Sequence, residues 1–186
     1  MLNYNELKPG EYVVIDGQPY LVLEFNFLRM QQRKPVVQTK IKNLISGKII
    51  EKSFQPSDKF EEAEIETKPI RYLYNHREEF LFCPENNPRD RFKIEEKIIG
   101  DAADLLKPNL IVGAMIFGEK IIGVKLPVKV ELRVVEAPPS TKGNTAQGGT
   151  KQVKLETGAS INVPLFVKEG DIIKINTETR QYVERM

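Results

Sequence analysis

The stretch Lys129-Val130-Glu131-Leu132-Arg133-Val134 alternates charged and apolar side chains without interruption. Successive side chains of a β-strand point to opposite faces, so this alternation predicts a strand with one buried and one solvated face. The same period of two recurs at residues 11–15, 40–44 and 171–175. We therefore expect an all-β fold.

Turn signals separate these stretches at short intervals. Short strands with frequent turns are typical of small β-barrels. One helix is expected over residues 94–106, where apolar side chains fall near helical spacing, and Gly100 marks a place where that helix can break. The turn pairs are Asp16-Gly17, Ser46-Gly47, Gly118-Glu119, Thr157-Gly158 and Glu169-Gly170.

Two interruptions of the strand pattern predict domain boundaries. Residues 58–68 are acidic and poor in aliphatic side chains, and Leu126-Pro127 precedes a fresh alternation. We expect three domains, over residues 1–65, 66–128 and 129–186, each small enough to need an efficient barrel core. The polar residues 138–150 are expected to form a long mobile loop within the third domain.

The composition excludes several classes of site. The chain has 186 residues, 40% of them hydrophobic, which is enough for packed cores. Cys83 is the only cysteine, so an internal disulfide is impossible and a reducing, cytoplasmic location is expected. With one cysteine and one histidine, a zinc site is not expected. No signal peptide, no apolar run long enough to cross a membrane and no cofactor or metal are expected.

The sequence contains no recognisable combination of catalytic residues. His76 lies in a polar turn with no second histidine for a proton relay, and Cys83, expected to be a small, partly buried residue, lacks a histidine partner. The segment 143–150 nearly matches a phosphate-binding loop, but Gly149 stands where that loop needs lysine. We expect a binding protein and not an enzyme.

The charge is unevenly distributed along the chain. The net charge is +2, yet residues 29–52 hold seven basic residues against one acid, Glu51, a local charge of +6. Such a block suits a phosphate backbone, and it equally suits the solvated face of a β-hairpin. Both interpretations stay open at this point.

Residues 151–170, KQVKLETGASINVPLFVKEG, closely resemble the elongation factor P signature. Gly17–Tyr20, Tyr72–Asn75 and Leu126-Pro127 add to the similarity, whereas Asn144 stands where the family usually has Asp. The resemblance implies an L-shaped molecule with a KOW/SH3-like amino-terminal barrel followed by two OB-fold barrels. The two-domain eukaryotic initiation factor five A is a relative, but the third domain fits the bacterial form better.

The resemblance also implies a function. Members of the family bind the ribosome between the peptidyl and exit sites, contact both subunits, ribosomal RNA and peptidyl-tRNA, and stimulate peptide bonds that stall at consecutive prolines. A cytoplasmic monomer is implied, with an enzyme that modifies an effector loop as a further partner. Alternatives are a divergent paralogue with another stalling-motif preference and a generic protein that binds single-stranded RNA.

The effector loop is where this chain departs from the family. A gap-free count places Gln32 at the position that is usually a modified lysine or arginine, and the usual Pro-Gly is absent. Glutamine forms hydrogen bonds but carries no charge. The factor then works unmodified, a neighbour replaces the usual residue, the chain is a paralogue, or Gln31 and Gln32 simply tolerate an exposed turn. The tip residues are Arg29, Met30, Gln31, Gln32, Arg33 and Lys34.

Four further residues are candidates for RNA contact. Lys40 and Lys42 lie in the basic block, and the resemblance implies that Tyr182 and Arg185, near the carboxyl terminus, contact the small ribosomal subunit. Tyrosine can stack on a base and arginine can hold a phosphate. From the residues alone, both are better explained as ordinary strand-end residues, and it is the resemblance that favours a contact role.

Overall fold

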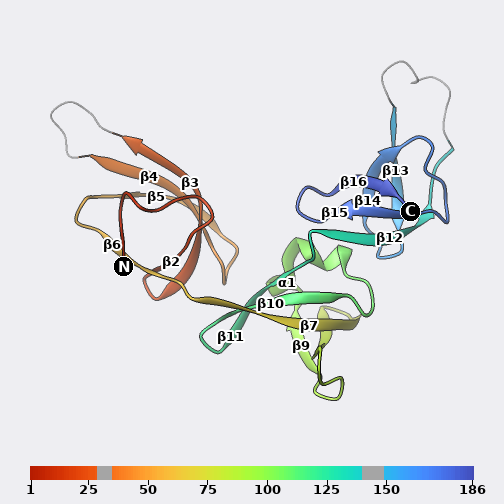
Figure 1. Ribbon diagram of the computed structural model, residues 1–186, viewed down its shortest axis with the longest axis horizontal. Helices are drawn as coiled ribbons and strands as arrows, with labels where there is room; N and C mark the ends of the chain where they lie inside the picture. Colours follow the sequence, from red (N-terminus) through yellow and green to blue (C-terminus); the bar gives the residue numbers. More distant parts are fainter. Residues whose placement is uncertain (29–34, 140–148) are drawn as a thin grey trace. The chain divides into compact units, whose positions relative to one another are not determined.

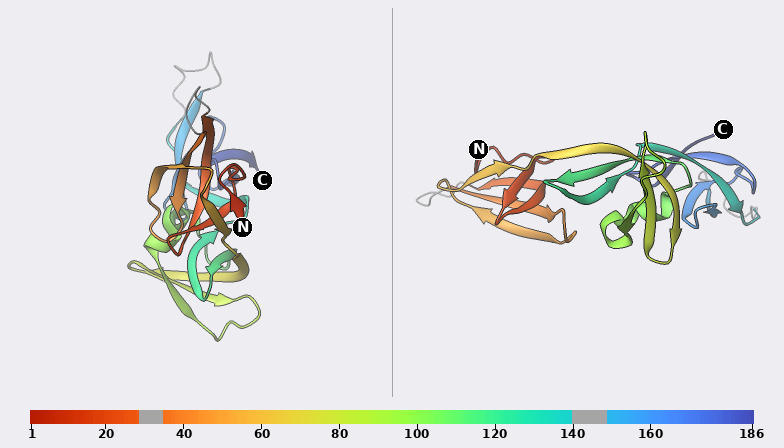
Figure 2. Two further views of the ribbon diagram at one scale, coloured as in Figure 1. Left: turned by 90° about the vertical axis from the view of Figure 1, so that its left-hand side faces the viewer. Right: turned by 90° about the horizontal axis from the view of Figure 1, so that it is seen from below.

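The strands of the chain form three β-sheets, which Figure 1 shows in a computed structural model describing residues 1–28, 35–139 and 149–186. The predicted all-β fold is confirmed. The alternating stretches found in the sequence become strands β2, β4, β12 and β15, within a residue or two of the expected ends except at the start of β4, which begins four residues earlier, at Val36. Figure 2 shows the same strands from two further sides, coloured along the sequence.

The first sheet orders its strands β1-β6-β2-β3-β4-β5. Asp16 and Gly17, with φ of 52° and 74°, form the tight turn between β2 and β3, a conformation that glycine adopts without strain. Its core includes the fully buried Leu7, Val13 and Ile41. The strands are β1 Leu2–Asn3, β2 Tyr12–Ile15, β3 Gln18–Leu28, β4 Val36–Asn43, β5 Ile49–Phe54 and β6 Lys59–Glu62.

The second sheet orders its strands β11-β10-β7-β8-β9. Its core includes a group of aromatic residues, in which the Tyr72 and Phe82 ring centroids lie 5.3 Å apart. The Cys83 thiol is buried in β8, more completely than the partly buried position expected. The strands are β7 Ile65–His76, β8 Glu79–Pro84, β9 Phe92–Glu95, β10 Ile111–Phe117 and β11 Lys120–Lys125.

The helix predicted over residues 94–106 is wrong at its start. Ile94 pairs with Phe80 across β8 and β9, so the first two residues of the predicted helix belong to a strand. After β9 the chain forms a short helix α1, Glu96–Ile99, and then a 3-10 helix η1, Gly100–Leu105. Gly100, with φ of 61°, separates the two, as its position in the sequence suggested.

The third sheet orders its strands β14-β13-β12-β15-β16. Val130, Leu132 and Val134 of β12 are buried, which confirms the alternation that predicted this strand. Pro164 ends the edge strand β14, where a missing N–H costs no ladder bond. The strands are β12 Lys129–Glu136, β13 Thr150–Leu155, β14 Ser160–Pro164, β15 Ile172–Asn176 and β16 Gln181–Arg185.

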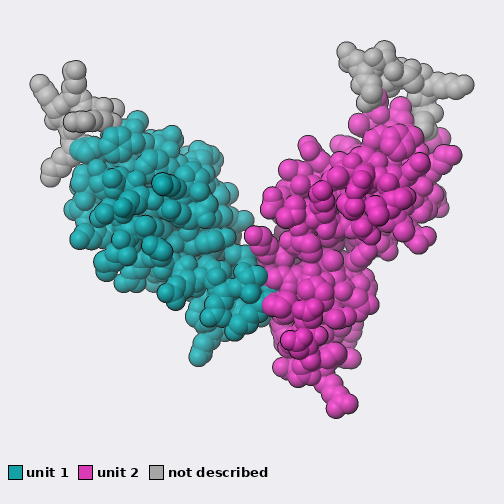
Figure 3. Space-filling view, in the orientation of Figure 1, with its two compact units in different colours: residues 1–68, 114–123 teal, residues 69–113, 124–186 magenta. Residues whose placement is uncertain are grey.

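Contacts between residues divide the chain into two compact units, which Figure 3 colours separately. The first unit comprises residues 1–68 and 114–123, and the second comprises residues 69–113 and 124–186. The second unit contains α1, η1 and the whole third sheet. The domain boundaries expected near residues 65 and 128 stay a prediction.

Candidate ribosome-binding surfaces

The β3–β4 hairpin forms a stem that leads to the predicted effector tip. Strand pairing continues from Glu24 opposite Lys40 to Leu28 opposite Val36. The tip residues Arg29 to Lys34, Gln32 among them, lie outside the described residues, so their predicted roles stay predictions. The stem shows that the segment between Leu28 and Pro35 is carried by two paired strands.

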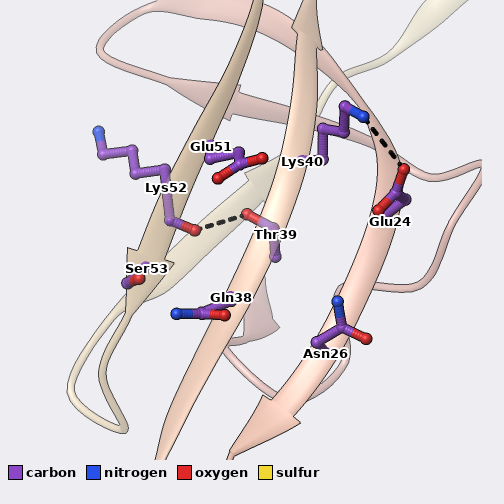
Figure 4. Close-up of a pocket in the computed structure, with 8 residues that line it drawn as sticks. All are labelled: Glu24, Asn26, Gln38, Thr39, Lys40, Glu51, Lys52 and Ser53. Carbon is purple, nitrogen blue, oxygen red and sulfur yellow. Dashed lines mark hydrogen bonds and ion pairs between the residues drawn. The ribbon is translucent and has the colours of Figure 1, made fainter.

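The outer face of β3, β4 and β5 is a polar surface arranged in rows across the strands. Directly opposite residues in antiparallel strands share a face. One row holds Glu24, Lys40 and Glu51, and the next holds Asn26, Gln38 and Ser53. Figure 4 shows these side chains around a shallow hollow of about 340 Å³.

Lys40 lies between two carboxylates. Its Nζ is 3.3 Å from Glu24 Oε1, and Glu51 lies opposite it on the neighbouring strand. The row formed by Glu24, Lys40 and Glu51 therefore has a net charge of −1, and a phosphate that approached Lys40 would meet two negative groups. The position of Lys40 in the strand does not favour phosphate binding.

Lys42 has different neighbours on the same face. Leu21 and Ile49, both uncharged, lie opposite it on the two flanking strands. Lys42 is exposed and forms no ion pair with another described residue. Of the two lysines predicted to bind RNA from the first unit, Lys42 is thus the one whose charge is free for a phosphate.

The other described lysines of the basic block also differ from one another. Lys52 is drawn towards Asp16, with its Nζ 3.7 Å from the carboxylate, and lies 5.8 Å from the centre of the Phe54 ring. Lys48 is exposed in the turn before β5 and forms no ion pair within the described ranges. The local charge counted from the sequence overstates the free positive charge, because Glu24 and Asp16 fold onto the block from outside it.

The carboxyl-terminal strand brings Tyr182 and Arg185 together around an exposed phenylalanine. Phe166, 54% exposed, lies in the β14–β15 loop, and its ring centroid is 6.4 Å from that of Tyr182, at an edge-on angle of 78°. The Arg185 guanidinium lies 5.3 Å from the same ring centroid and 3.5 Å from an oxygen of Asp171. We call Phe166, Tyr182 and Arg185 the C-terminal cluster.

The C-terminal cluster combines chemistry suited to unpaired bases. An exposed ring offers a stacking surface, and a guanidinium held beside it can meet a base or a phosphate. The sequence reasoning missed Phe166, which is followed along the chain by Val167, Lys168 and Glu169 and carries no local signal. Its exposure and its contacts with Tyr182 and Arg185 are visible only in the fold.

A charged pair stabilises the strand that carries this cluster. Lys174 Nζ donates a hydrogen bond of 2.6 Å to Glu184 Oε1 across β15 and β16. This hydrogen bond lowers the pKa of Glu184 and raises that of Lys174 from their ordinary values. The pair therefore stays ionised through the neutral range and favours the register of β16.

No metal centre is assembled in the part of the chain that the structure describes. His76 is exposed at the end of β7, as expected, beside Arg77 of the β7–β8 turn. Within residues 1–28, 35–139 and 149–186, no three His, Cys, Asp or Glu side chains are grouped so that they could hold a metal ion. Nor does any helix in these ranges have the length and apolar character to cross a membrane.

Comparison with solved structures shows the fold. The eukaryotic translation initiation factor 5A from Methanococcus jannaschii superposes with a TM-score of 0.51 over 68% of this chain and 92% of that one, at 17% sequence identity. This similarity supports an all-β architecture of several domains.

Comparison with sequences covers the whole chain. The elongation factor P KOW-like domain model matches residues 3–60, the elongation factor P OB domain model residues 65–124, and the elongation factor P C-terminal model residues 130–185. The elongation factor P of Carboxydothermus hydrogenoformans is 38% identical over all of both chains. That of Acetivibrio thermocellus is 40% identical over the same extent. The chain belongs to the elongation factor P family of translation factors.

Proposed function

We propose that the chain binds the ribosome between the peptidyl and exit sites and stimulates peptide-bond formation at consecutive prolines. The observation that carries the proposal is the end-to-end match with elongation factor P relatives, in a chain whose β3–β4 stem presents the expected effector segment. The partners are both ribosomal subunits, ribosomal RNA and peptidyl-tRNA, met by a monomer in the cytoplasm.

The chain contributes binding and positioning, and the chemistry belongs to the ribosome and its tRNA. Proline is a poor substrate for peptide transfer when the peptidyl-tRNA is badly placed. Holding that tRNA in a productive geometry lowers the entropy lost on reaching the transition state. A paired stem serves this purpose because an ordered support loses less entropy on binding than a free loop.

Within the tip, Arg33 and Lys34 matter more than Gln32. The proposed surroundings are rich in phosphate, and only a cation gains from them. We expect Arg33→Ala and Lys34→Ala each to lower the stimulation of Pro-Pro bond formation on reconstituted ribosomes, and Gln32→Ala to lower it less. If Gln32→Ala alone abolished stimulation while both charge deletions stayed active, the neutral side chain would be the effector.

An enzyme that modifies the tip is a further proposed partner. Intact mass of the natively expressed protein, followed by peptide mapping across residues 27–40, detects such a modification. An unmodified tip in a fully active protein would show that this chain needs no modifying enzyme.

RNA contact is divided between the two units. Lys42 in the first unit supplies a free cation, and the C-terminal cluster in the second supplies an aromatic surface with a guanidinium. Both kinds of contact suit ribosomal RNA. Lys40 is a poor phosphate ligand by comparison, because Glu24 and Glu51 flank it.

Ribosome binding tests the proposal directly. We expect salt-dependent binding to ribosomes, because phosphate contacts release counterions, and weak competition by free RNA oligomers. A divergent paralogue would bind equally well but would relieve stalling at other motifs. Equal affinity for ribosomes and for any single-stranded oligomer would instead indicate a generic RNA-binding protein.

A further inference from the structure

The turn between β15 and β16 contacts η1, far away in the sequence. Arg180, in this turn, donates a hydrogen bond of 2.6 Å from Nη2 to the backbone oxygen of Asp101, and the same nitrogen pairs with the Asp104 carboxylate. Both acceptors belong to η1, which comes after β9 and α1 of the second sheet. All three residues lie in the second unit. A single guanidinium therefore joins the third sheet to the segment that connects β9 and β10 of the second sheet.

Two further contacts join the segment from η1 to Lys107 to the third sheet. Leu105, the last residue of η1, is 1% exposed and belongs to the core of the third sheet with Val130 and Leu132. Lys107 Nζ donates a hydrogen bond of 2.5 Å to the backbone oxygen of Glu131 in β12. The segment from η1 to Lys107 thus touches the third sheet at its core, at β12 and at the β15–β16 turn.

The apolar contact and the hydrogen bonds have different effects on how the two segments are held. Apolar burial of Leu105 is non-directional, so by itself it holds the two parts together and still permits rotation about the contact. Hydrogen bonds from a planar guanidinium are directional and favour one orientation. The Arg180–Asp104 ion pair is about half exposed, with side chains 44% and 43% accessible, so it adds little to stability. Its expected effect is on orientation.

Arg180 also lies two residues before Tyr182. Its backbone, with φ of 56°, forms the turn that leads into β16, the strand that carries Tyr182 and Arg185 of the C-terminal cluster. We propose that Arg180 is a positioning residue, whose contacts with η1 hold the C-terminal cluster at a fixed orientation to residues 69–113 of the same unit. The effect of this orientation on ribosome binding rests on the proposed function. A fixed orientation allows the C-terminal cluster and the rest of the second unit to contact the ribosome at the same time.

The test replaces Arg180 with asparagine, which tolerates a positive φ and removes the guanidinium. Arg77→Asn is a matched control. Arg77 has φ of 58°, lies in the β7–β8 turn, and has neither a hydrogen bond nor an ion pair to a described residue. Both variants are made in the full chain. A thermal unfolding midpoint close to that of wild type shows that each variant folds.

Residual dipolar couplings in a weakly aligning medium report orientation in the free protein. We expect one alignment tensor to fit residues 69–113 and the third sheet, both in the second unit, in the wild type and in Arg77→Asn. In Arg180→Asn, these two parts should need different tensors. A single unchanged tensor in Arg180→Asn would overturn the positioning role.

Ribosome affinity separates this inference from the proposed function. We expect Arg180→Asn to weaken binding roughly fivefold, the loss of about one ordered contact, and Arg77→Asn to leave it unchanged. If Arg180→Asn bound ribosomes as tightly as wild type although the third sheet had changed its orientation, the role of this orientation in ribosome binding would be overturned. A wild-type chain that failed to bind ribosomes would refute the proposed function and leave the tensor result as the test of Arg180.

Discussion

The neighbours of Lys40 and Lys42 predict that the two lysines contribute unequally to RNA binding. A simple alanine scan would confuse the comparison, because removing either lysine also removes one positive charge from the first unit. The paired variant Glu24→Gln with Lys40→Gln avoids this, since it deletes one charge of each sign and leaves the net charge unchanged. Lys42→Gln then measures the loss of a free cation.

The strand register sets the magnitude of the expected effect. Lys42 has only Leu21 and Ile49 opposite it, so a phosphate contact there is lost outright in the variant. One such contact is worth about 1 kcal/mol, or about fivefold in affinity, and lowers the slope of log affinity against log salt by about 1. The Glu24–Lys40 pair is a surface ion pair of 3.3 Å, and its removal should change stability by less than about 1 kcal/mol.

Ribosome binding across a salt series is the assay. We expect Lys42→Gln to weaken binding and flatten the salt dependence, and the paired variant to match the wild type in both. Circular dichroism melts check that both proteins fold. A paired variant that lost as much affinity and slope as Lys42→Gln would refute the reasoning, because Lys40 would then contact phosphate despite its two carboxylate neighbours.

Three further predictions concern other parts of the molecule. Leu105→Ala should destabilise the second unit by about 2 to 5 kcal/mol, because it leaves a cavity in the third sheet's core, and urea unfolding monitored by circular dichroism measures this loss; a change below about 1 kcal/mol would contradict the shared core. Burial raises the pKa of Tyr72, so the stability that its neutral phenol contributes is full below pH of about 10 and is lost as pH rises through the raised pKa. Tyr72→Phe should therefore lose less stability than wild type in alkaline thermal melts. Identical pH profiles of the two proteins would show that Tyr72 does not cause the loss. Phe166→Ala should weaken ribosome binding several-fold while Val135→Ala, at another exposed apolar position of the third sheet, should not; equal effects would remove the C-terminal cluster from the interface.

The sequence predicted the strands better than it predicted the helix. Alternation with a period of two reflects one buried and one exposed face, a property that is visible within a single strand. In β12, exposed and buried side chains alternate as the sequence predicted. Residues 94–106 mislead because Phe92 and Ile94 already have a strand period that runs into the apolar spacing of α1 and η1. The pairing of Ile94 with Phe80, fourteen positions earlier in the chain, decides in favour of a strand.

The sequence could not show how the charges of the basic block are paired, because that depends on neighbours distant in the chain. Counting charges within residues 29–52 cannot include Glu24 and Asp16, which reach Lys40 and Lys52 only after the strands pair. Arg180 and Asp104 are a stronger case, because residues 76 positions apart meet where the β15–β16 turn contacts η1. Phe166 was missed for a similar reason, since its contacts with Tyr182 and Arg185 depend on residues distant in the chain.

Stimulation of peptide bonds between prolines is tested by a single-turnover rate on reconstituted ribosomes. The rate of Pro-Pro bond formation is measured with and without the purified chain, beside a template that encodes no consecutive prolines. We expect a marked increase for the proline template alone. An unchanged Pro-Pro rate, at a concentration of the chain that saturates its binding to the ribosome, would contradict the proposed function.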